Sequence, residues 1–310
     1  MVQLGEFGRP ILVGLVLGVL ARWYLLRLDY RQYPSYPHGY LTHLAFGVIA
    51  AFVGAVAVPA LAAREFTAVT FLALTAQQFR DIRNLERETL TRMEEDLLVP
   101  RGADYIEGIA RVFEARNYMV IFVALLASTA TQVSLGYPFL GLKPYASIVG
   151  VVVGAVTIFF SIKFMSGKSI GDIGVVREGK VRFDGPGLYV DDIYIMNVGL
   201  KSARKAIQEG GLGVVIEPKD DNARDTLGNL GQRQAISHDV AAVLGVKKDY
   251  ATPEFTPLVR RNLENGQLGM IFVPMEPDME ALLEVVRRVP VLEATRGRAM
   301  YTRAGRKASD

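Results

Sequence analysis

The chain has 310 residues, of which 50% are apolar, with a formal net charge of +3 and no cysteine. The positive mean hydropathy is high for a soluble protein and low for one embedded wholly in lipid, so a membrane part joined to a water-soluble part is expected. The absence of cysteine excludes a thiol nucleophile, a thiolate metal site and a disulfide, and the small charge gives no argument for binding nucleic acid.

Apolar runs in the first half predict a multi-span α-helical membrane domain over residues 1–164. Residues 41–62 carry no formal charge and residues 146–162 are almost purely apolar, so both runs are long enough to cross a bilayer. Residues 118–135 are also apolar but include hydroxyl and amide side chains. Those groups can hydrogen-bond across helices, so this span is expected to face protein more than lipid.

The first apolar run, residues 10–26, is shorter and contains Arg22. Its long side chain could reach the membrane interface beside Trp23. A span is favoured over a cleaved signal peptide, because no small-residue cleavage site follows and further spans come after it.

The number of spans depends on residues 66–79, which are short for a span and equally suit a buried or re-entrant helix. If this run crosses, Arg27 and Arg31 lie on the same side as segment 80–117 and the C-terminal region, as the positive-inside rule requires. Five spans with a cytoplasmic C-terminus are therefore favoured, and four spans are the alternative.

Segment 80–117 is a charged insertion in the membrane domain, with seven arginines among nine acidic residues. Glu88 and Arg92 are spaced for a helical ion pair, and residues 100–102 read as a turn. The segment is interpreted as a solvated cytoplasmic helix hairpin. A docking surface for a partner or for the C-terminal domain is the functional alternative.

Residues 165–310 predict a cytoplasmic α/β domain of short strands and polar helices. Residues 175–183 read as a hairpin that turns at Glu178 and Gly179. Residues 188–198 offer one or two further strands, interrupted by Asp191 and Asp192.

An internal repeat fits this domain. Residues 210–218 align without gaps with residues 266–274, and the polar stretch 203–207 matches 259–263 in character. Each unit reads as a polar helix, a glycine turn, a buried strand and a proline stop. The similarity can come from a duplication or from the ordinary succession of helix and strand, and both explanations remain open.

Several residue patterns were weighed as chemical sites. Residues 166–169 lack the upstream glycine of a phosphate loop and follow a membrane span, so they are not interpreted as a nucleotide site. Asp191 and Asp192 could bind a metal or act as acid and base, although neighbours on a strand point to opposite faces and a solvated turn is the simpler interpretation. His38 and His43 have no acid or third histidine near them in sequence and are interpreted as structural.

The richest polar region is 220–239, which follows a predicted strand. It contains Asp225, His238 and Asp239, but consecutive residues such as Ser237, His238 and Asp239 cannot form a hydrolytic triad among themselves. The simpler interpretation is a polar amphipathic helix with an acidic N-terminal cap, and Gly228 makes one continuous helix doubtful.

One polar segment stands before the 118–135 run and consists of Tyr105, Ile106, Glu107, Gly108, Ile109 and Ala110. On a helix Glu107 can pair with Arg111, while Ile106, Ile109 and Phe113 share an apolar side. Glycine inside a helix costs about 1 kcal/mol relative to alanine, so Gly108 suggests that another backbone or helix approaches closely. The segment is expected to form part of a platform on which the C-terminal domain docks.

These six residues spell the name of the YIEGIA family of membrane proteins from endospore-forming bacteria, and the chain resembles that family. The resemblance extends to segments 29–34, 36–39, 65–71 and 77–81. The resemblance implies that the protein belongs to sporulation membranes, but it indicates no particular reaction. Proteolysis is the alternative activity.

Three functions are considered. The favoured one is a sporulation-associated membrane protein whose cytoplasmic domain regulates or scaffolds protein partners. The alternative is a membrane-tethered protease, for which the residues to test are Asp191, Asp192, Asp225, His238 and Asp239. A transporter is disfavoured because the spans lack charged residues that would line a path.

The expected partners are the lipid bilayer and a cytosolic or membrane protein, with no nucleic acid, cofactor or metal, and the oligomeric state is left open. The expected location is the cell membrane, and the membrane of the forespore or spore is the more specific alternative.

Overall fold

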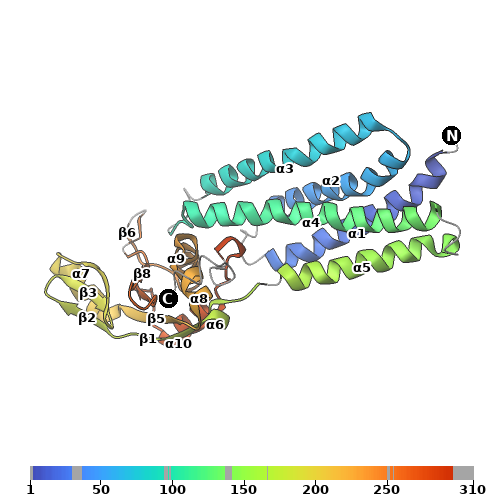
Figure 1. Ribbon diagram of the computed structural model, residues 1–310. Helices are drawn as coiled ribbons and strands as arrows, with labels where there is room; N and C mark the ends of the chain where they lie inside the picture. The colour runs from blue at the N-terminus through green and yellow to red at the C-terminus, as the bar shows by residue number, and fades with distance from the viewer. Residues whose placement is uncertain are drawn as a thin grey trace. The chain divides into compact units, whose positions relative to one another are not determined.

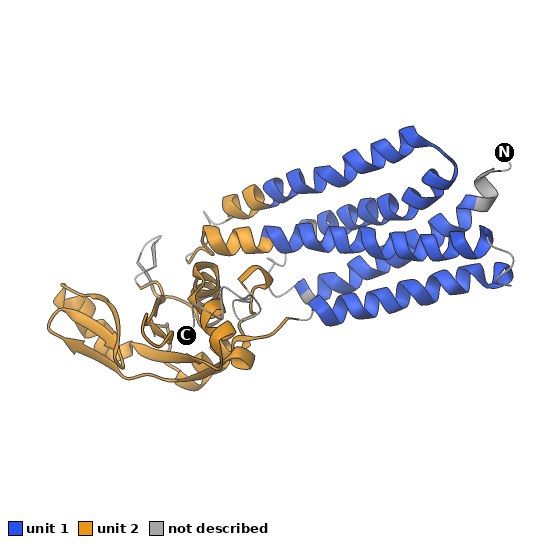
Figure 2. Cartoon of the chain, viewed as in Figure 1, with its two compact units in different colours: residues 1–86, 110–166 blue, residues 87–109, 167–310 orange. Residues whose placement is uncertain are grey.

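The computed structural model describes residues 3–29, 37–93, 97, 99–136, 142–165, 167–249, 252, 253 and 255–295. Two compact units divide the chain: residues 1–86 with 110–166, and residues 87–109 with 167–310 (Figure 2). The division at 166 falls close to the domain boundary predicted from the sequence. Residues 87–109, however, which were assigned to an insertion in the membrane domain, group with the second unit.

The first unit is a bundle of long helices (Figure 1). Its elements are α1 (Gln3–Asp29), α2 (Pro37–Ala62), the first part of α3 (Phe66–Met93), most of α4 (Ala103–Gly136), the short helix Lys143–Tyr145 and α5 (Ala146–Met165). Four stretches are long and apolar enough to cross a membrane: Phe7–Arg27, Gly39–Ala62, Ala103–Gly136 and Lys143–Met165. The helix α3 is not among them, because its second half is rich in charge.

Small residues allow the helices of this unit to pack closely. Ala51, Ala55 and Ala124 are fully buried between α1, α2 and α4. A Cβ added to Gly54 would collide with the carbonyl of Ile121, so α2 and α4 meet backbone to backbone there. As predicted for the 118–135 run, one hydroxyl reaches across helices: Ser128 Oγ donates to the Ala55 carbonyl at 2.7 Å.

A buried network of charged side chains joins four of the helices. Asp29 accepts hydrogen bonds from Arg22 Nη1 at 3.4 Å and from Arg116 Nε at 3.0 Å, and all three side chains are at most 3% exposed. His43 lies 3.1 Å from both Arg22 Nη2 and Glu86 Oε1. The expectation that Arg22 reaches a membrane interface is therefore wrong, because its counter-charge lies inside the bundle.

The hydrogen bonds also define the protonation of His43. A guanidinium can only donate, so Nδ1 of His43 must be the acceptor from Arg22, and Nε2 carries the proton that is donated to Glu86. The imidazole is then neutral.

The second unit contains two main antiparallel sheets. The four-stranded sheet has the order β1 (Gly174–Glu178), β5 (Leu212–Pro218), β9 (Leu268–Phe272) and β8 (Leu258–Arg261), and the three-stranded sheet has the order β2 (Val181–Asp184), β3 (Gly187–Val190) and β4 (Ile193–Asn197). A small pair, β6 (Lys248–Asp249) and β7 (Thr252–Pro253), lies apart from them. Buried aliphatic side chains of both main sheets form one core that includes Leu188, Ile195, Val215 and Ile271.

Helices complete this unit. They are α6 (Ile170–Ile173), α7 (Lys201–Gly210), α8 (Asp221–Gly228), α9 (Leu230–Leu244), α10 (Met279–Arg288) and the short helix Glu293–Thr295. The doubt about one continuous helix over 220–239 was justified, since α8 and α9 are separated at Asn229, which caps α9. Asp220 caps α8 by accepting from the Ala223 amide, as the acidic-cap interpretation predicted.

The predicted hairpin over residues 175–183 is wrong. β1 pairs with β5, whereas β2 pairs with β3, so the chain passes from one sheet to the other at Gly179. The Gly179 amide donates to the Gly213 carbonyl at 2.9 Å, and a Cβ on Gly213 would collide with the Gly179 carbonyl. The glycine that looked like a hairpin turn is thus required for a close crossing of two chain segments.

The helix predicted within residues 259–263 is also wrong, because Leu258–Arg261 is the strand β8. Its four residues pair with β9, and this long-range pairing outweighs the local polar character of the stretch. The other aligned segments do form equivalent strands: β5 and β9 are antiparallel neighbours with Val214 opposite Met270. The duplication stays a prediction.

The buried network yields a stability prediction. Substituting Asp29→Asn should lower the free energy of unfolding by about 3–5 kcal/mol, because Arg22 and Arg116 lose their shared counter-charge while they stay buried. Thermal and denaturant unfolding of the detergent-solubilised chain measures this. The control is Arg87→Ala, whose half-exposed pair with Glu107 at 3.9 Å should change stability by no more than about 1 kcal/mol. Equal effects of the two substitutions would contradict the prediction.

Candidate functional site

The six residues 105–110 lie in the first turns of α4, at the point where this helix passes from the second unit to the first. Tyr105 is 1% exposed and Ile109 fully buried, and Ile106 and Ala110 are also buried. Only Glu107 keeps contact with solvent, and its carboxylate lies 3.9 Å from Arg87 of α3. Within the second unit, this segment is therefore part of the core.

Helix α9 is the main partner of the beginning of α4. The Tyr105 amide donates to Gln234 Oε1 at 3.0 Å, which satisfies a backbone donor at the helix N-terminus. The tyrosine ring meets His238 edge on, with ring centroids 6.2 Å apart. A Cβ on Gly231 would lie only 2.9 Å from the Asp104 carbonyl, so the N-termini of the two helices approach closely.

Gly108 faces the segment that precedes the C-terminal tail. A Cβ added there would lie 3.7 Å from Leu292 and 3.9 Å from Ala294, which are ordinary contact distances. The predicted neighbour is present, but it would tolerate a methyl group. Gln232 holds the same segment: its fully buried side chain donates to the Pro290 carbonyl at 3.1 Å and accepts from the Leu292 amide at 2.8 Å.

Two of the predicted site residues, His238 and Asp239, lie on α9. Nδ1 of His238 is 2.8 Å from the Val99 carbonyl, so the ring holds the loop that precedes α4. Burial raises the pKa of Asp239 to about 7, and the positive charge of Arg101 only partly offsets this effect. His238 thus holds the loop around residues 99–102 by a hydrogen bond, and Asp239 lies near the charge of Arg101 in the same loop.

Asp191 and Asp192 form the turn between β3 and β4, and Asp191 has a left-handed φ of 51°. Asp191 accepts from Arg177 Nη1 and from the Lys180 amide, both at 2.7 Å. Burial acts to raise the pKa of Asp191, but these hydrogen bonds and the Arg177 charge outweigh it and hold the pKa below its usual value. Asp192 is 97% exposed, so the pair does not form a shared carboxylate site.

Asp225 is exposed on α8. The five predicted catalytic residues thus lie on three elements: the β3–β4 turn, α8 and α9. Among the described residues, no group of three or more histidine, aspartate or glutamate side chains is arranged to hold a metal ion. The described histidine of the membrane half, His43, belongs to the buried charge network, and the side chain of His38 lies outside the described residues.

Residues 166–169 do not form a phosphate loop in the part that the structure describes. The carbonyl of Lys168 accepts from the Val291 amide at 2.8 Å, and both the amide and the hydroxyl of Ser169 donate to Asp172 Oδ2. The first of these hydrogen bonds, from the Ser169 amide, lowers the pKa of Asp172. Ser-x-x-Asp is the spacing of a capping box, a signal that was present in the sequence and was missed.

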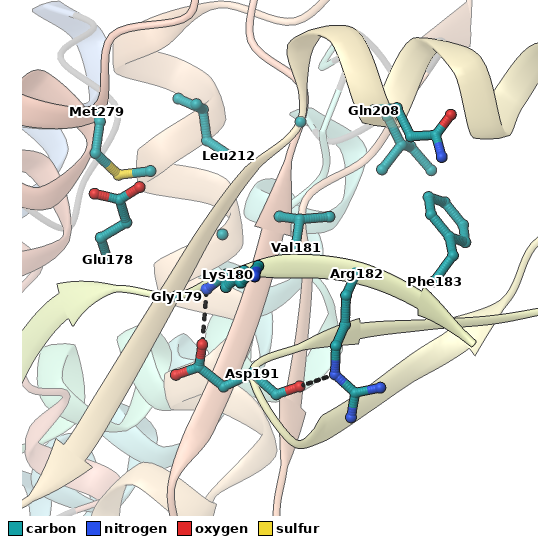
Figure 3. Close-up of a pocket in the computed structure, with 13 residues that line it drawn as sticks. Glu178, Gly179, Lys180, Val181, Arg182, Phe183, Asp191, Gln208, Leu212 and Met279 are labelled. Atoms are coloured by element: carbon teal, nitrogen blue, oxygen red, sulfur yellow. Dashed lines mark hydrogen bonds between the residues drawn. The ribbon is translucent and has the colours of Figure 1, made fainter.

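A groove of about 720 Å³ lies in the second unit between β2, the end of α7 and the beginning of β5 (Figure 3). Glycines 179, 211 and 213 line it, together with the apolar residues Val181, Phe183 and Leu212. Sequence reasoning did not identify this groove, because it depends on the crossing of the chain at Gly179.

The fold therefore defines a class of protein: a bundle with four helices long and apolar enough to cross a membrane, followed by an antiparallel α/β unit that encloses the first turns of α4. The family model described as YIEGIA protein matches residues 10–302, and the chain belongs to this family. It is 47% identical over 291 residues to "Uncharacterized protein YphB" of Bacillus subtilis (strain 168), with 94% of each chain covered. No solved structure matches the chain.

The raised pKa of Asp239 gives a prediction of pH dependence. In the unfolded chain an aspartate titrates near its ordinary pKa of about 3.9, so between about pH 4 and pH 7 the folded state binds more protons and stability falls as the pH rises. Asp239→Asn should remove this dependence and raise the melting temperature at pH 8 relative to the parent chain. The free-energy difference should be at most about 4 kcal/mol.

Thermal unfolding of the detergent-solubilised chain at pH 5, 6.5 and 8 tests this prediction. Asp225→Asn is the matched control, because that carboxyl group is exposed, and it should leave the pH profile unchanged. The raised pKa of Asp239 would be contradicted if the melting temperature of the parent chain did not change between pH 5 and pH 8. It would also be contradicted if this temperature rose with pH and Asp239→Asn left the rise unchanged.

Proposed function

We propose that this chain is an integral membrane protein whose α/β unit regulates or scaffolds cytoplasmic protein partners during sporulation. Membership of the family, and a relative from an endospore-forming bacterium, support the setting. One observation supports a role other than catalysis. The candidate catalytic residues Asp191, His238 and Asp239 already make structural contacts in turns and between helices within the unit.

The second candidate, a membrane-tethered protease, is favoured by one observation. Asp239 has a pKa of about 7, and groups that titrate near neutral pH are suited to acid–base catalysis. The nearest imidazole in sequence, His238, is already bonded to the Val99 carbonyl. Regulation or scaffolding is therefore the function that the geometry supports better.

We also propose five spans, with the α/β unit in the cytoplasm. The three residues 63–65 join α2 to α3, and Arg64 has a left-handed φ of 60°. Figure 1 shows α3 returning beside α2, and Leu72 of α3 packs against Val53 and Ala60 of α2. If α2 crosses the membrane, a helix that packs back along it crosses as well.

The cysteine-free chain allows a direct test of this topology. Single cysteines are introduced at the exposed positions Glu65, Lys143 and Ser202, and protoplasts are treated with a membrane-impermeant maleimide. Five spans predict labelling of Glu65→Cys and Lys143→Cys, and labelling of Ser202→Cys only after lysis. With four spans and a cytoplasmic C-terminus, position 65 would also be protected in intact protoplasts.

The function itself is tested by comparing proteomes of sporulating cells. Cells express the intact chain or a version with alanine at Asp191, Asp192, Asp225, His238 or Asp239, and Asp239→Asn serves as a shape-preserving variant. Scaffolding predicts that variants with normal membrane levels give the same proteome and crosslink to the same partners. A protein that is depleted by the intact chain and restored by Asp239→Asn, at equal membrane levels, would favour proteolysis instead.

A further inference from the structure

Three arginines of the second unit lie near one another, beside the junction of α8 and α9. Arg233 belongs to the beginning of α9, and Arg260 and Arg261 end the strand β8, against which α9 packs (Figure 1). Burial lowers the pKa of Arg233, and the positive charges of Arg260 and Arg261 lower it further. Among the described residues, no acid offsets these charges at Arg233.

Two of the arginines extend to the same point of the junction. A Cβ added to Gly228, the last residue of α8, would be 2.5 Å from Arg261 Nη1 and 2.8 Å from its Cζ, so the missing side chain leaves the space that the guanidinium occupies. The Arg233 amide donates to the Asn229 carbonyl at 3.2 Å. Side chains on a helix lean toward its N-terminus, so the Arg233 guanidinium extends back toward Asn229 and Gly228.

Both of these arginines have hydrogen-bond donors that the chain leaves unused. The Nε atoms of Arg233 and Arg261 are buried and have no acceptor. In the part of the chain that the structure describes, no carboxylate forms an ion pair with either guanidinium. Burying a charged donor without an acceptor is unfavourable, and a like charge close by adds to this cost. A bound anion would relieve both effects.

The other arginines around the junction are satisfied by the chain itself. Arg224 of α8 donates from Nη2 to the Glu264 carbonyl at 2.7 Å, and Arg260 donates from Nε to a carbonyl of β4 at 3.2 Å. Neighbours on a strand point to opposite faces, so Arg260 adds positive charge near Arg261 but no donor on its face. The unused donors of the junction therefore belong to Arg233 and Arg261.

The chemistry of these donors favours a phosphate group. A guanidinium binds an oxyanion well along the edge that carries Nε and one Nη, because the two N–H groups there point in parallel. A carboxylate has two oxygens and a single charge, which suits one such edge. A phosphate monoester offers three acceptor oxygens and about two negative charges, so it can bond two guanidinium groups and balance their charge.

We propose that Arg233 and Arg261 bind a phosphate group at the junction of α8 and α9. Free phosphate and a phosphate monoester of a small molecule supply the same group. Both side chains are half-buried, so an anion reaches them from solvent, and a change of rotamer turns the Nε edge toward it. The inference goes beyond the proposed function and does not depend on it, because no partner protein is needed.

The test follows thermal unfolding of the full chain in maltoside micelles at pH 8, while inorganic phosphate or glycerol 3-phosphate is added at constant ionic strength. A ligand that binds the folded state raises the melting temperature. We expect a saturable rise with phosphate-bearing ligands and none with glycerol or sodium chloride. Tighter binding of glycerol 3-phosphate identifies a monoester as the source, and equal or tighter binding of inorganic phosphate identifies free phosphate. No rise with either ligand would overturn the proposal.

Substitutions locate the site. Arg233→Gln and Arg261→Gln should each weaken phosphate binding at least about tenfold, because each removes one charged pair of donors. Arg288→Gln is the matched control, since that side chain is 77% exposed on α10, and it should leave binding unchanged. Unchanged binding in both junction variants would place the phosphate elsewhere and sink the assignment.

Two further readouts separate binding from a structural role. Without ligand, Arg233→Gln should not lower the melting temperature, because it removes a buried charge that Arg261 repels. Arg233→Lys keeps the charge but loses the parallel donors, so it should still weaken binding at least about threefold even if Arg233→Gln fails to fold. A lower melting temperature without ligand, together with full phosphate affinity in Arg233→Lys, would show that the arginine only supports the fold.

Discussion

The bundle depends on the compensation of buried charge around Asp29. Removing a carboxylate from water is unfavourable by several kcal/mol unless cationic partners with good geometry surround it, and Asp29 has two, Arg22 and Arg116. Because these residues lie on α1 and α4, the pairing fixes how the two helices align along their length. His43 and Glu86 extend the same constraint to α2 and α3. Apolar packing between smooth, alanine-rich helices would allow them to slide, whereas a buried ion network specifies one alignment.

The helix α4 carries a second constraint, of a different kind. Its residues 105–110 are buried by packing and by backbone hydrogen bonds, with Gln234 satisfying the Tyr105 amide and Gln232 holding the segment that covers Gly108. Arg116 in the charge network lies less than two turns further along the same helix. One continuous helix therefore belongs to the core of the α/β unit at its beginning and to the bundle thereafter.

Local patterns predicted those parts of the fold that local chemistry decides. The long apolar runs, the helix break next to Gly228, the acidic cap of α8 and the turn at Asp191 each depend on residues close in sequence. The predictions that were wrong concern pairing over long distances. Gly179 reads locally as a hairpin turn, and only the position of Gly213 makes it a crossing between sheets. The stretch 259–263 reads as a polar helix until β9 is placed beside the strand Leu258–Arg261. Likewise, His43, a partner of Arg22, comes from a different helix, and no local spacing indicates it.

The raised pKa of Asp239 shows why a perturbed group is not by itself a catalytic one. Its cause is burial, and the burial accompanies the closure of the loop around Val99 and Arg101, which His238 holds by its hydrogen bond to the Val99 carbonyl. A catalytic carboxylate must reach a substrate, whereas this one is partly covered by its own chain. If the loop opened, Asp239 would gain water and its pKa would fall toward the ordinary value of about 3.9, so the carboxyl group would be ionised at neutral pH. Ionisation of Asp239 and opening of the loop are therefore thermodynamically linked, because the open state binds fewer protons at neutral pH.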